Sequence, residues 1–328
     1  MQPAATDSRA SGADPEKATP RSRSGFLDFA HSHCLRRTEK TAERLAAARS
    51  DPTASAVHDL RVAARRLVYT LDCFSVLLDA DRAADFRKRV KSLLSAARLV
   101  RELDVALELV SKLDSGLQHS IADDLRRRRD TAARLMSERL ERKGVQKLTR
   151  RWLSTASGAA PEPAKETPEA TKAGGRWYSH LPWMPEQSCA ANASAVLPSL
   201  AADYFRQGRA ACIEGTPPDE LHAFRLASKR LRYCLELFSE QYGPSLATRL
   251  ESLRDIQGRL GALSDYDSTI RLLDSAEAPS DSASLRLLTI LSDGQGDATE
   301  SFLKSWKRNL DTPNVEDDWK TYLTLPQE

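Results

Sequence analysis

Glycine and aromatic residues are scarce in this chain of 328 residues, which has 14 glycines and only 6% aromatic residues. Alanine, leucine and arginine dominate instead, a composition that favours α-helix. The sequence shows no glycine-rich phosphate loop, no Ser/His/Asp set and no cluster of metal-ligating residues. We therefore expect a protein that is not an enzyme and that holds no cofactor and no metal.

Long apolar runs and a strong charge imbalance are absent as well. No window approaches the roughly 20 apolar residues of a membrane helix, and the N-terminus carries acidic residues but no apolar signal segment. Residues 1–24 are rich in Ala, Ser, Pro and Arg, which predicts a disordered tail. With 49 Lys and Arg against 46 Asp and Glu, the net charge is only +3, so any anion site must come from local clustering of cations.

The cysteines have neither the CxxC spacing of a zinc site nor the even number that suits a disulfide framework. Three of them lie among apolar residues at helical spacing, which indicates buried, reduced thiols; these are Cys73, Cys212 and Cys234. The other two are Cys34 and Cys189. Reduced thiols are typical of the cytoplasm, where we expect the protein to be found.

What the chain does contain is an internal repeat. Residues 57–74 read VHDLRVAARRLVYTLDCF, and residues 221–238 read LHAFRLASKRLRYCLELF. The two segments align without a gap, and their separation of 164 residues is half the chain length, which indicates a duplication. The identical pairs are His58/His222, Arg61/Arg225, Ala63/Ala227, Arg66/Arg230, Leu67/Leu231, Tyr69/Tyr233, Leu71/Leu235 and Phe74/Phe238.

Helical spacing divides each repeat segment into a cationic side and an apolar side. The first cationic side, with Arg66 at its border, comprises His58, Arg61, Val62, Arg65 and Tyr69, and the side opposite comprises Val57, Leu60, Ala64, Leu67, Leu71 and Phe74. The second cationic side comprises His222, Arg225, Lys229 and Tyr233, opposite Leu221, Phe224, Leu231, Leu235 and Phe238. We therefore expect the apolar sides to close the core without the cations.

The rest of the chain predicts an all-α fold of two four-helix bundles, related by duplication and pseudo-twofold symmetry. The first half, residues 25–153, has helices expected at 26–49, 84–110 and 118–153, with the His58 helix ending near residue 78. A proline-rich linker follows at 154–187, and its segment WYSHLPWM is expected to dock on the helices. The second half, residues 188–310, has one helix up to 213, the His222 helix capped by Thr216 and ending at 243, and helices at 245–273 and 280–310, the last capped by Ser280. Residues 311–328 are expected to form a loosely held acidic tail.

The third helices of the two halves also correspond. Residues 101–105, RELDV, align with residues 264–268, SDYDS, and Lys91 aligns with Arg254. Arg87, Lys91 and Arg98 fall close together around the helix and form a second cationic stripe. We favour pairing with arginines over metal binding for the aspartates of these motifs, Asp104, Asp265 and Asp267.

These segments resemble the CHAD domain, the conserved histidine α-helical domain. The resemblance rests on VHDLRVAARRL (57–67), RELDV (101–105), LHAFRLASKRLRY (221–233) and LGALSDYD (260–267), and it covers residues 25–310. It implies two four-helix bundles with pseudo-twofold symmetry. It also implies binding of inorganic polyphosphate in a basic groove or pore, and an association with polyphosphate granules.

The resemblance further implies a set of polyphosphate-binding residues in each half. In the first half these are His58, Arg61, Arg65, Arg66, Lys91, Arg98 and Arg101. In the second half they are His222, Arg225, Lys229, Arg230, Arg232 and Arg254. Two departures stand out: Ser264 replaces the basic residue found at Arg101, and the long linker has no counterpart in the repeat.

The residue chemistry suits a polyanion without reference to the family. Arginine grips phosphate oxygens with two parallel hydrogen bonds, while lysine acts as a point charge. An Arg-rich helix face is usually only a solvated surface, but its duplication together with the histidine argues for a ligand. Acidic residues are interspersed with the arginines at 126–129, so solvated ion pairs explain that cluster. Each histidine alone has an alternative role, bonding a neighbouring backbone or carboxylate group.

Three functions follow, of which polyphosphate binding is the first. A helical RNA- or DNA-binding protein would share the basic stripe, but the chain has no aromatic stacking platform and no helix-turn-helix. A polyphosphate-cleaving enzyme would need the alternating acidic and basic motif of the triphosphate tunnel domain, which is missing. The chain is also compatible with an accessory module of a phosphate-metabolising enzyme. We expect no membrane partner.

Overall fold

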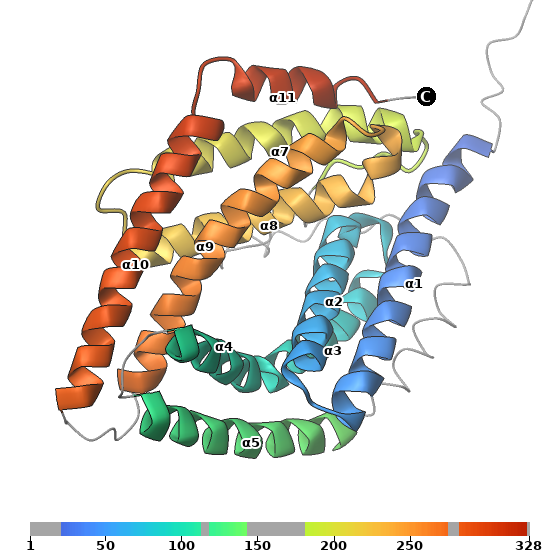
Figure 1. Ribbon diagram of the computed structural model, residues 1–328. Coiled ribbons are helices and arrows are strands. Elements are labelled where there is room, and N and C mark those ends of the chain that lie inside the picture. Colours follow the sequence, from blue (N-terminus) through green and yellow to red (C-terminus); the bar gives the residue numbers. More distant parts are fainter. Residues whose placement is uncertain (1–20, 113–117, 143–180, 275–281, 327–328) are drawn as a thin grey trace, which may run out of the picture.

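The computed structural model describes residues 21–112, 118–142, 181–274 and 282–326, and every regular element in these ranges is helical, which confirms the all-α prediction (Figure 1). No helix in these ranges is both long and apolar enough to span a membrane. The elements are α1 (Arg21–Ser50), α2 (Ala54–Cys73), η1 (Ser75–Leu77), α3 (Ala80–Ala96), α4 (Arg98–Lys112), α5 (Gln118–Arg142), α7 (Cys189–Ala211), α8 (Pro218–Leu237), η3 (Ser239–Gln241), α9 (Leu246–Asp274), α10 (Ser282–Asn309) and α11 (Val315–Leu323).

The repeat segments form α2 and α8, and their apolar sides are buried as predicted. All the apolar residues assigned to the two core faces, from Val57 to Phe74 and from Leu221 to Phe238, are buried. Each helix ends at its phenylalanine, Phe74 or Phe238, and continues into a short 3-10 turn. The two copies of the repeat therefore share their local structure as well as their sequence.

The start of α8 differs by one residue from the prediction. Pro217 occupies the N-cap position and Pro218 the first helical position, so Thr216 does not cap the helix. The Thr216 hydroxyl instead donates to the carbonyl of Ile213, at 2.7 Å, in the preceding turn. In the first copy a threonine does cap, because Thr53 Oγ1 accepts from the amide of Ala56 at 3.2 Å.

The predicted third helix, 84–110, is wrong as a single element. It begins earlier, after the N-cap Asp79, and it breaks at Ala97 into α3 and α4. Neither glycine nor proline marks this break, so no local signal predicts it. The break lets α3 pack against α2 while α4 packs against α5 and α9. The corresponding helix of the second half, α9, is continuous.

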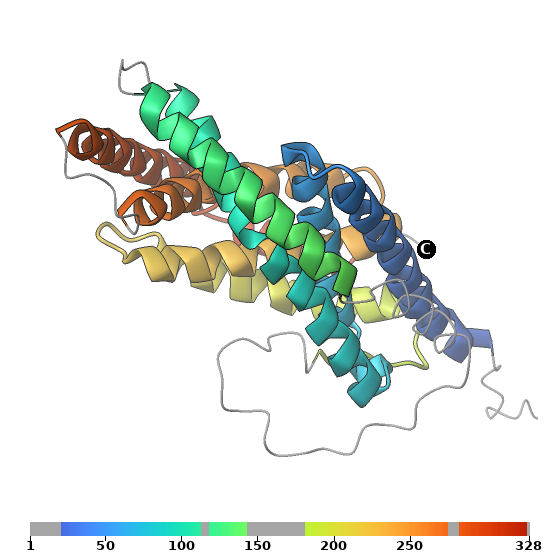
Figure 2. The same ribbon diagram turned by 90° about the horizontal axis from the view of Figure 1, so that it is seen from below.

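Four helices form a closed ring around the middle of the molecule. Helix α2 contacts α8, α8 contacts α9, α9 contacts α4, and α4 contacts α2 (Figure 1). Four further helices cover this ring from outside: α1 packs on α2, α7 on α8, α10 on α9, and α5 along α4 (Figure 2). Helix α3 also packs on α2, and α11 packs on α7. Any side chain on the inner faces of α2, α4, α8 and α9 therefore has neighbours from both halves of the sequence.

The hydrophobic core also joins the two halves. Its larger cluster combines residues of α1, α2 and α3 with residues of the second half, and Trp183 from the end of the linker lies within it. The Trp183 indole donates to the carbonyl of Cys73 at 2.6 Å and packs against Phe26 and Phe238. This part of the predicted linker docking is confirmed, while Trp177 and Tyr178 lie outside the described residues.

The three cysteines predicted to be buried thiols, Cys73, Cys212 and Cys234, are buried and free. Residues 21–24, which were predicted to belong to the disordered tail, are instead the first residues of α1. Other predictions cannot be placed. The tail before residue 21, the linker up to residue 180, the helical stretch 143–153 and the Ser280 cap all lie outside the described residues.

The prediction of a loosely held C-terminal tail is wrong. Residues Val315–Leu323 form α11, which packs on α7 with Trp319 and Leu323 buried. The Tyr242 hydroxyl donates to the carbonyl of Leu323 at 2.7 Å, and the Tyr322 hydroxyl donates to the carbonyl of Tyr242 at 2.8 Å. The acidic composition hid this helix, although Trp319 and Leu323 have the i, i+4 spacing of a buried face.

The equivalent core leucines of the two repeats provide a test of the packing. We expect Leu67→Ala or Leu231→Ala to lower the free energy of unfolding by about 2–5 kcal/mol, because each leaves a cavity where a fully buried side chain stood. Urea denaturation measures the change. Leu135→Ala, at a side chain that is 49% exposed, serves as control and should shift stability by no more than about 0.5 kcal/mol. Equal effects at all three positions would contradict the assignment of the core.

Candidate anion-binding site

Helices α2 and α8 meet at equivalent residues of the repeat. The rings of Tyr69 and Tyr233 lie 5.0 Å apart between centroids, and those of Phe74 and Phe238 lie 6.4 Å apart. Arg65 and Lys229, which are also equivalent, are close enough for the charge of Arg65 to lower the pKa of Lys229. The contact therefore brings the cationic sides of both repeats together.

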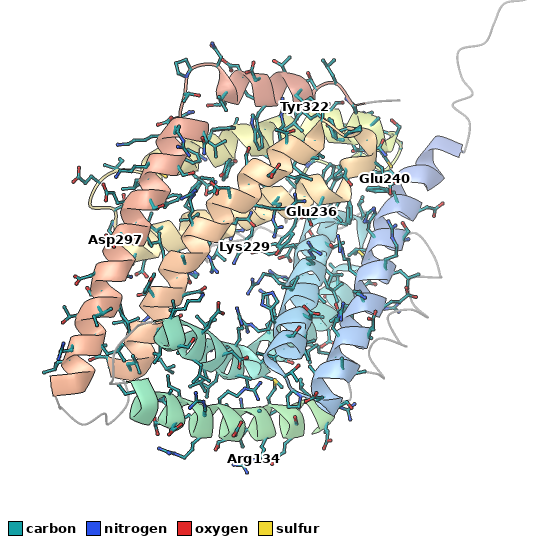
Figure 3. All side chains as sticks on the ribbon, in the orientation of Figure 1. Arg134, Lys229, Glu236, Glu240, Asp297 and Tyr322 are labelled. Atoms are coloured by element: carbon teal, nitrogen blue, oxygen red, sulfur yellow. The ribbon has the colours of Figure 1, made fainter. Side chains whose placement is uncertain are left out.

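Lys229 is the most unusual residue of this region. It is only 7% exposed, and Figure 3 places it on the side of α8 that faces the middle of the ring. Within the described residues its ammonium group has no hydrogen bond and no ion pair, although a buried ammonium normally needs a partner. Burial, followed by the charges of Arg65, Arg225 and Arg232, lowers the pKa of Lys229 from 10.5 to about 6.

The arginines next to Lys229 also have too few acidic partners to balance their charge. Burial lowers the pKa of Arg225, and its Nε atom is buried without a hydrogen-bond partner. The acid that faces it is Asp265 of α9, whose own pKa is raised by burial in spite of the nearby Arg225, Arg101 and Lys229. One carboxyl group thus stands against several cations. We call Arg65, Arg101, Arg225 and Lys229 the central cationic cluster; it draws on α2, α4 and α8.

Arg61 belongs to the edge of this cluster and has a structural contact as well. Its guanidinium Nη1 donates to the carbonyl of Leu94 at 2.8 Å. This carbonyl lies in the last turn of α3, where the break at Ala97 leaves helix carbonyls without intrahelical partners. Burial, then the charge of Arg65, lowers the pKa of Arg61 to about 10. Arg61 therefore holds the end of α3 next to the central cationic cluster.

The two histidines lie at the rim, where both are exposed. The pKa of His58 is lowered by partial burial and then by Arg101, while the pKa of His222 is lowered by partial burial and then by Arg225 and Lys229. Both imidazoles are consequently neutral at pH 7 in the absence of a ligand. Within the described residues neither histidine makes a hydrogen bond, so the alternative of a backbone or carboxylate contact finds no support there.

Other predicted site residues lie near acids beside the central cationic cluster. Arg66 and Arg232 contact Glu236 at 3.4 and 3.2 Å, and both guanidinium groups lie over the ring of Tyr233. The charges of Lys91 and Arg230 act on Asp72, which is paired with Arg87.

Two predicted residues lie apart. Arg98 is 70% exposed and 3.9 Å from Glu102, although its charge still acts on Arg61. Arg254 is exposed on α9, and no interaction joins it to the central cationic cluster. The predicted residues thus divide into a group that the ring gathers and a group that it leaves on the periphery.

Two of the three aspartates of the third-helix motifs pair with arginines, as predicted. Asp104 binds Arg129 at 3.0 Å, and Asp267 binds Arg271. Asp265 forms no such pair within the described residues, although the charges of Arg225 and Arg101 act on it. The arginines of α5 behave as expected in part, since Arg126 and Arg127 form exposed pairs with the preceding aspartates. Arg129 departs from that expectation, because its pair with Asp104 is largely buried and fixes α5 against α4.

Sequence reasoning missed the burial of Lys229 and the roles of Glu236 and the two tyrosines. A signal for Tyr69 and Tyr233 was present, since both are identical in the repeat and both lie on the cationic side. The burial of Lys229 had no such signal, because the same spacing in α2 leaves Arg65 partly exposed. The neighbours that cover Lys229 come from helices far away in the sequence.

Comparison with known proteins gives a consistent result. The family model of the CHAD domain matches residues 30–274. The crystal structure of the CHAD domain from the plant Ricinus communis superposes with a TM-score of 0.61 at 17% identity, covering 92% of this chain and 94% of that one. PptA from Streptomyces chartreusis superposes with a TM-score of 0.58 at 19% identity, covering 87% of this chain and 99% of that one. The comparison with curated protein sequences gives no match. Because the family model spans most of the sequence, the chain belongs to the CHAD domain family.

Proposed function

We propose that the central cationic cluster binds inorganic polyphosphate and that the protein is a binding module rather than an enzyme. The observation that carries this proposal is the buried Lys229, which faces three arginines and has no anionic partner bonded to it among the described residues. Keeping an amino group buried beside these cations is unfavourable for folding, because it either carries an unpaired charge or has to give up its proton. A phosphate chain that enters the ring removes this penalty, because its oxygens accept hydrogen bonds from Lys229 and the guanidinium groups.

The arrangement of the cations suits a linear anion. Arg101 on α4, Arg65 on α2, and Arg225 and Lys229 on α8 present their charges from three walls of the ring. Arginine forks and a lysine point charge together match a repeating phosphate better than a single flat surface does. Membership of the CHAD family supports the same ligand, and we propose a cytoplasmic location with recruitment to polyphosphate granules.

Nucleic acid is the competing ligand, because it offers the same phosphate charges. The tyrosines at the site are packed against each other, and Tyr233 is buried. They are therefore not open platforms for stacking bases, which single-stranded binding normally uses. This observation favours polyphosphate over RNA or DNA. A role as accessory module of a phosphate-metabolising enzyme remains compatible with the binding function.

Competition binding distinguishes these ligands. We expect long-chain polyphosphate to displace a labelled polyphosphate probe far better than RNA of equal total charge, measured by fluorescence anisotropy over a salt series. Affinity should fall steeply with salt, since binding releases counterions. Equal competition by RNA would instead support a general polyanion or nucleic-acid binder.

The substitution Lys229→Met separates binding from folding. It keeps the length of the side chain but removes an amino group whose charged form is disfavoured by burial, so the unliganded protein should become more stable while polyphosphate binding weakens by about 1–3 kcal/mol. Thermal unfolding and calorimetry measure the two effects, and Arg65→Ala should weaken binding similarly with little loss of stability. Arg126→Met, at an exposed α5 position, is the control that loses one cation outside the ring. Unfolding of the Lys229→Met protein would show that Lys229 is structural.

The lowered pKa of Lys229 predicts proton uptake on binding. Between pH 6 and 10.5 the folded, unliganded protein binds fewer protons here than the unfolded chain, so this residue makes stability rise with pH in that window. A bound anion raises the pKa, hence binding near pH 8 should take up about one proton and tighten as the pH falls towards 6. Calorimetry in buffers of different ionisation enthalpy measures the uptake.

Two variants assign this proton. Lys229→Met should abolish the uptake at pH 8. The double substitution H58Q/H222Q should leave it intact at pH 8, because the lowered pKa values of both imidazoles keep them neutral at that pH. Uptake at pH 8 that survives Lys229→Met would assign the proton to another group.

A further inference from the structure

Cationic side chains continue from the ring towards α1, a helix for which no site residue was predicted. Arg232 connects the two regions, since its charge acts on Lys229 while its guanidinium lies 4.7 Å from the centre of the Tyr233 ring. Figure 3 shows Lys229 and then Glu236 along α8, followed by Glu240 of η3, so this part of the chain runs from the ring towards α1. Arg66 approaches Glu236 from α2, so the set spans the crossing of the two repeat helices.

Helix α1 adds two arginines to this set. Arg37 is half-buried, and its pKa is lowered by burial and then by Arg66, while Glu236 opposes the shift. Within the described residues Arg37 has no ion pair, and Arg36 contacts only the Nε2 atom of His33, at 3.0 Å. Three arginines, Arg37, Arg66 and Arg232, therefore lie near Glu236, and the charge of Arg36 acts on Arg37. We call Arg36, Arg37, Arg66 and Arg232 the α1-side cluster.

Glu236 neutralises the α1-side cluster only in part, since it pairs with Arg66 and Arg232. Even in these two arginines the Nε atoms are buried and have no hydrogen-bond partner. His33, at the edge of the cluster, has its pKa lowered to about 4 by burial and then by Arg36 and Arg37, so it adds no positive charge at neutral pH. Glu236 holds Arg66 and Arg232 in place but leaves the other two arginines available for an external anion.

We propose that Arg36 and Arg37 extend the anion site from the central cationic cluster, over the crossing of α2 and α8, onto α1. The inference rests on the proposed polyphosphate function, and it adds that affinity depends on the length of the phosphate chain. A short phosphate chain fills the ring alone. A long chain also reaches the α1-side cluster, where each further contact is made by a chain already held in place and therefore at high effective concentration.

A length series tests this extension. Full-length wild-type protein and the double variant R36Q/R37Q are titrated with tripolyphosphate and with chains of about 15 and about 100 phosphates. We expect the variant to bind the two longer chains at least roughly tenfold more weakly, with a shallower salt dependence, because phosphate contacts are lost. Its affinity for the shortest chain that binds should stay within about twofold of wild type.

The control is R126Q/R127Q, which removes the same charge from exposed positions on α5 and should leave all affinities near wild type. Arg36→Gln alone, at an exposed side chain, replaces the double variant if the change at Arg37 unfolds the protein. An unchanged affinity for long chains, or an equal loss at every length, would overturn the extension onto α1. If wild type binds no polyphosphate of any length, the proposed function itself fails.

Discussion

The contact between α2 and α8 is the interaction on which the rest of the structure depends. It holds several cationic side chains close together. Two like charges at about 4 Å in a partly buried setting repel each other by on the order of 4 kcal/mol. Behind the cations, each repeat segment buries at least five large apolar side chains, and each of these contributes about 1.5–3 kcal/mol. The apolar sides therefore outweigh the repulsion and fix the charges where they are.

The acids around the crossing determine where a ligand has to supply negative charge. Glu236 neutralises cations on the α1 side, Asp72 does so on the α3 side, and the half-buried Asp265 is the acid that acts on both Arg225 and Lys229 of the central cationic cluster. The flanks are thus partly balanced by the protein itself, while the middle is not. This distribution explains why a chain with a net charge of only +3 can present a concentrated positive site, since clustering rather than net charge creates the local field.

The amphipathic repeats made much of the fold predictable. The core positions of α2 and α8 followed from helical spacing, and so did the separation of a cationic side. Two elements were not predictable in the same way. The break at Ala97 has no glycine or proline to mark it, and α11 was hidden by its acidic residues, although Trp319 and Leu323 anchor it.

The sequence predicted which residues belong to the candidate site, but it did not predict how those residues lie relative to one another. By itself the sequence determined that the chain is helical, which side of each repeat is apolar, and that two copies carry a histidine and basic residues at the same spacing, because these properties depend on near neighbours along one helix. Only the tertiary structure decided that Lys229 is buried beside Arg65, that Arg254 stands apart, and that Arg37 of α1 joins Arg66. Those relations depend on which helices meet, and the meeting residues are separated by up to half the chain.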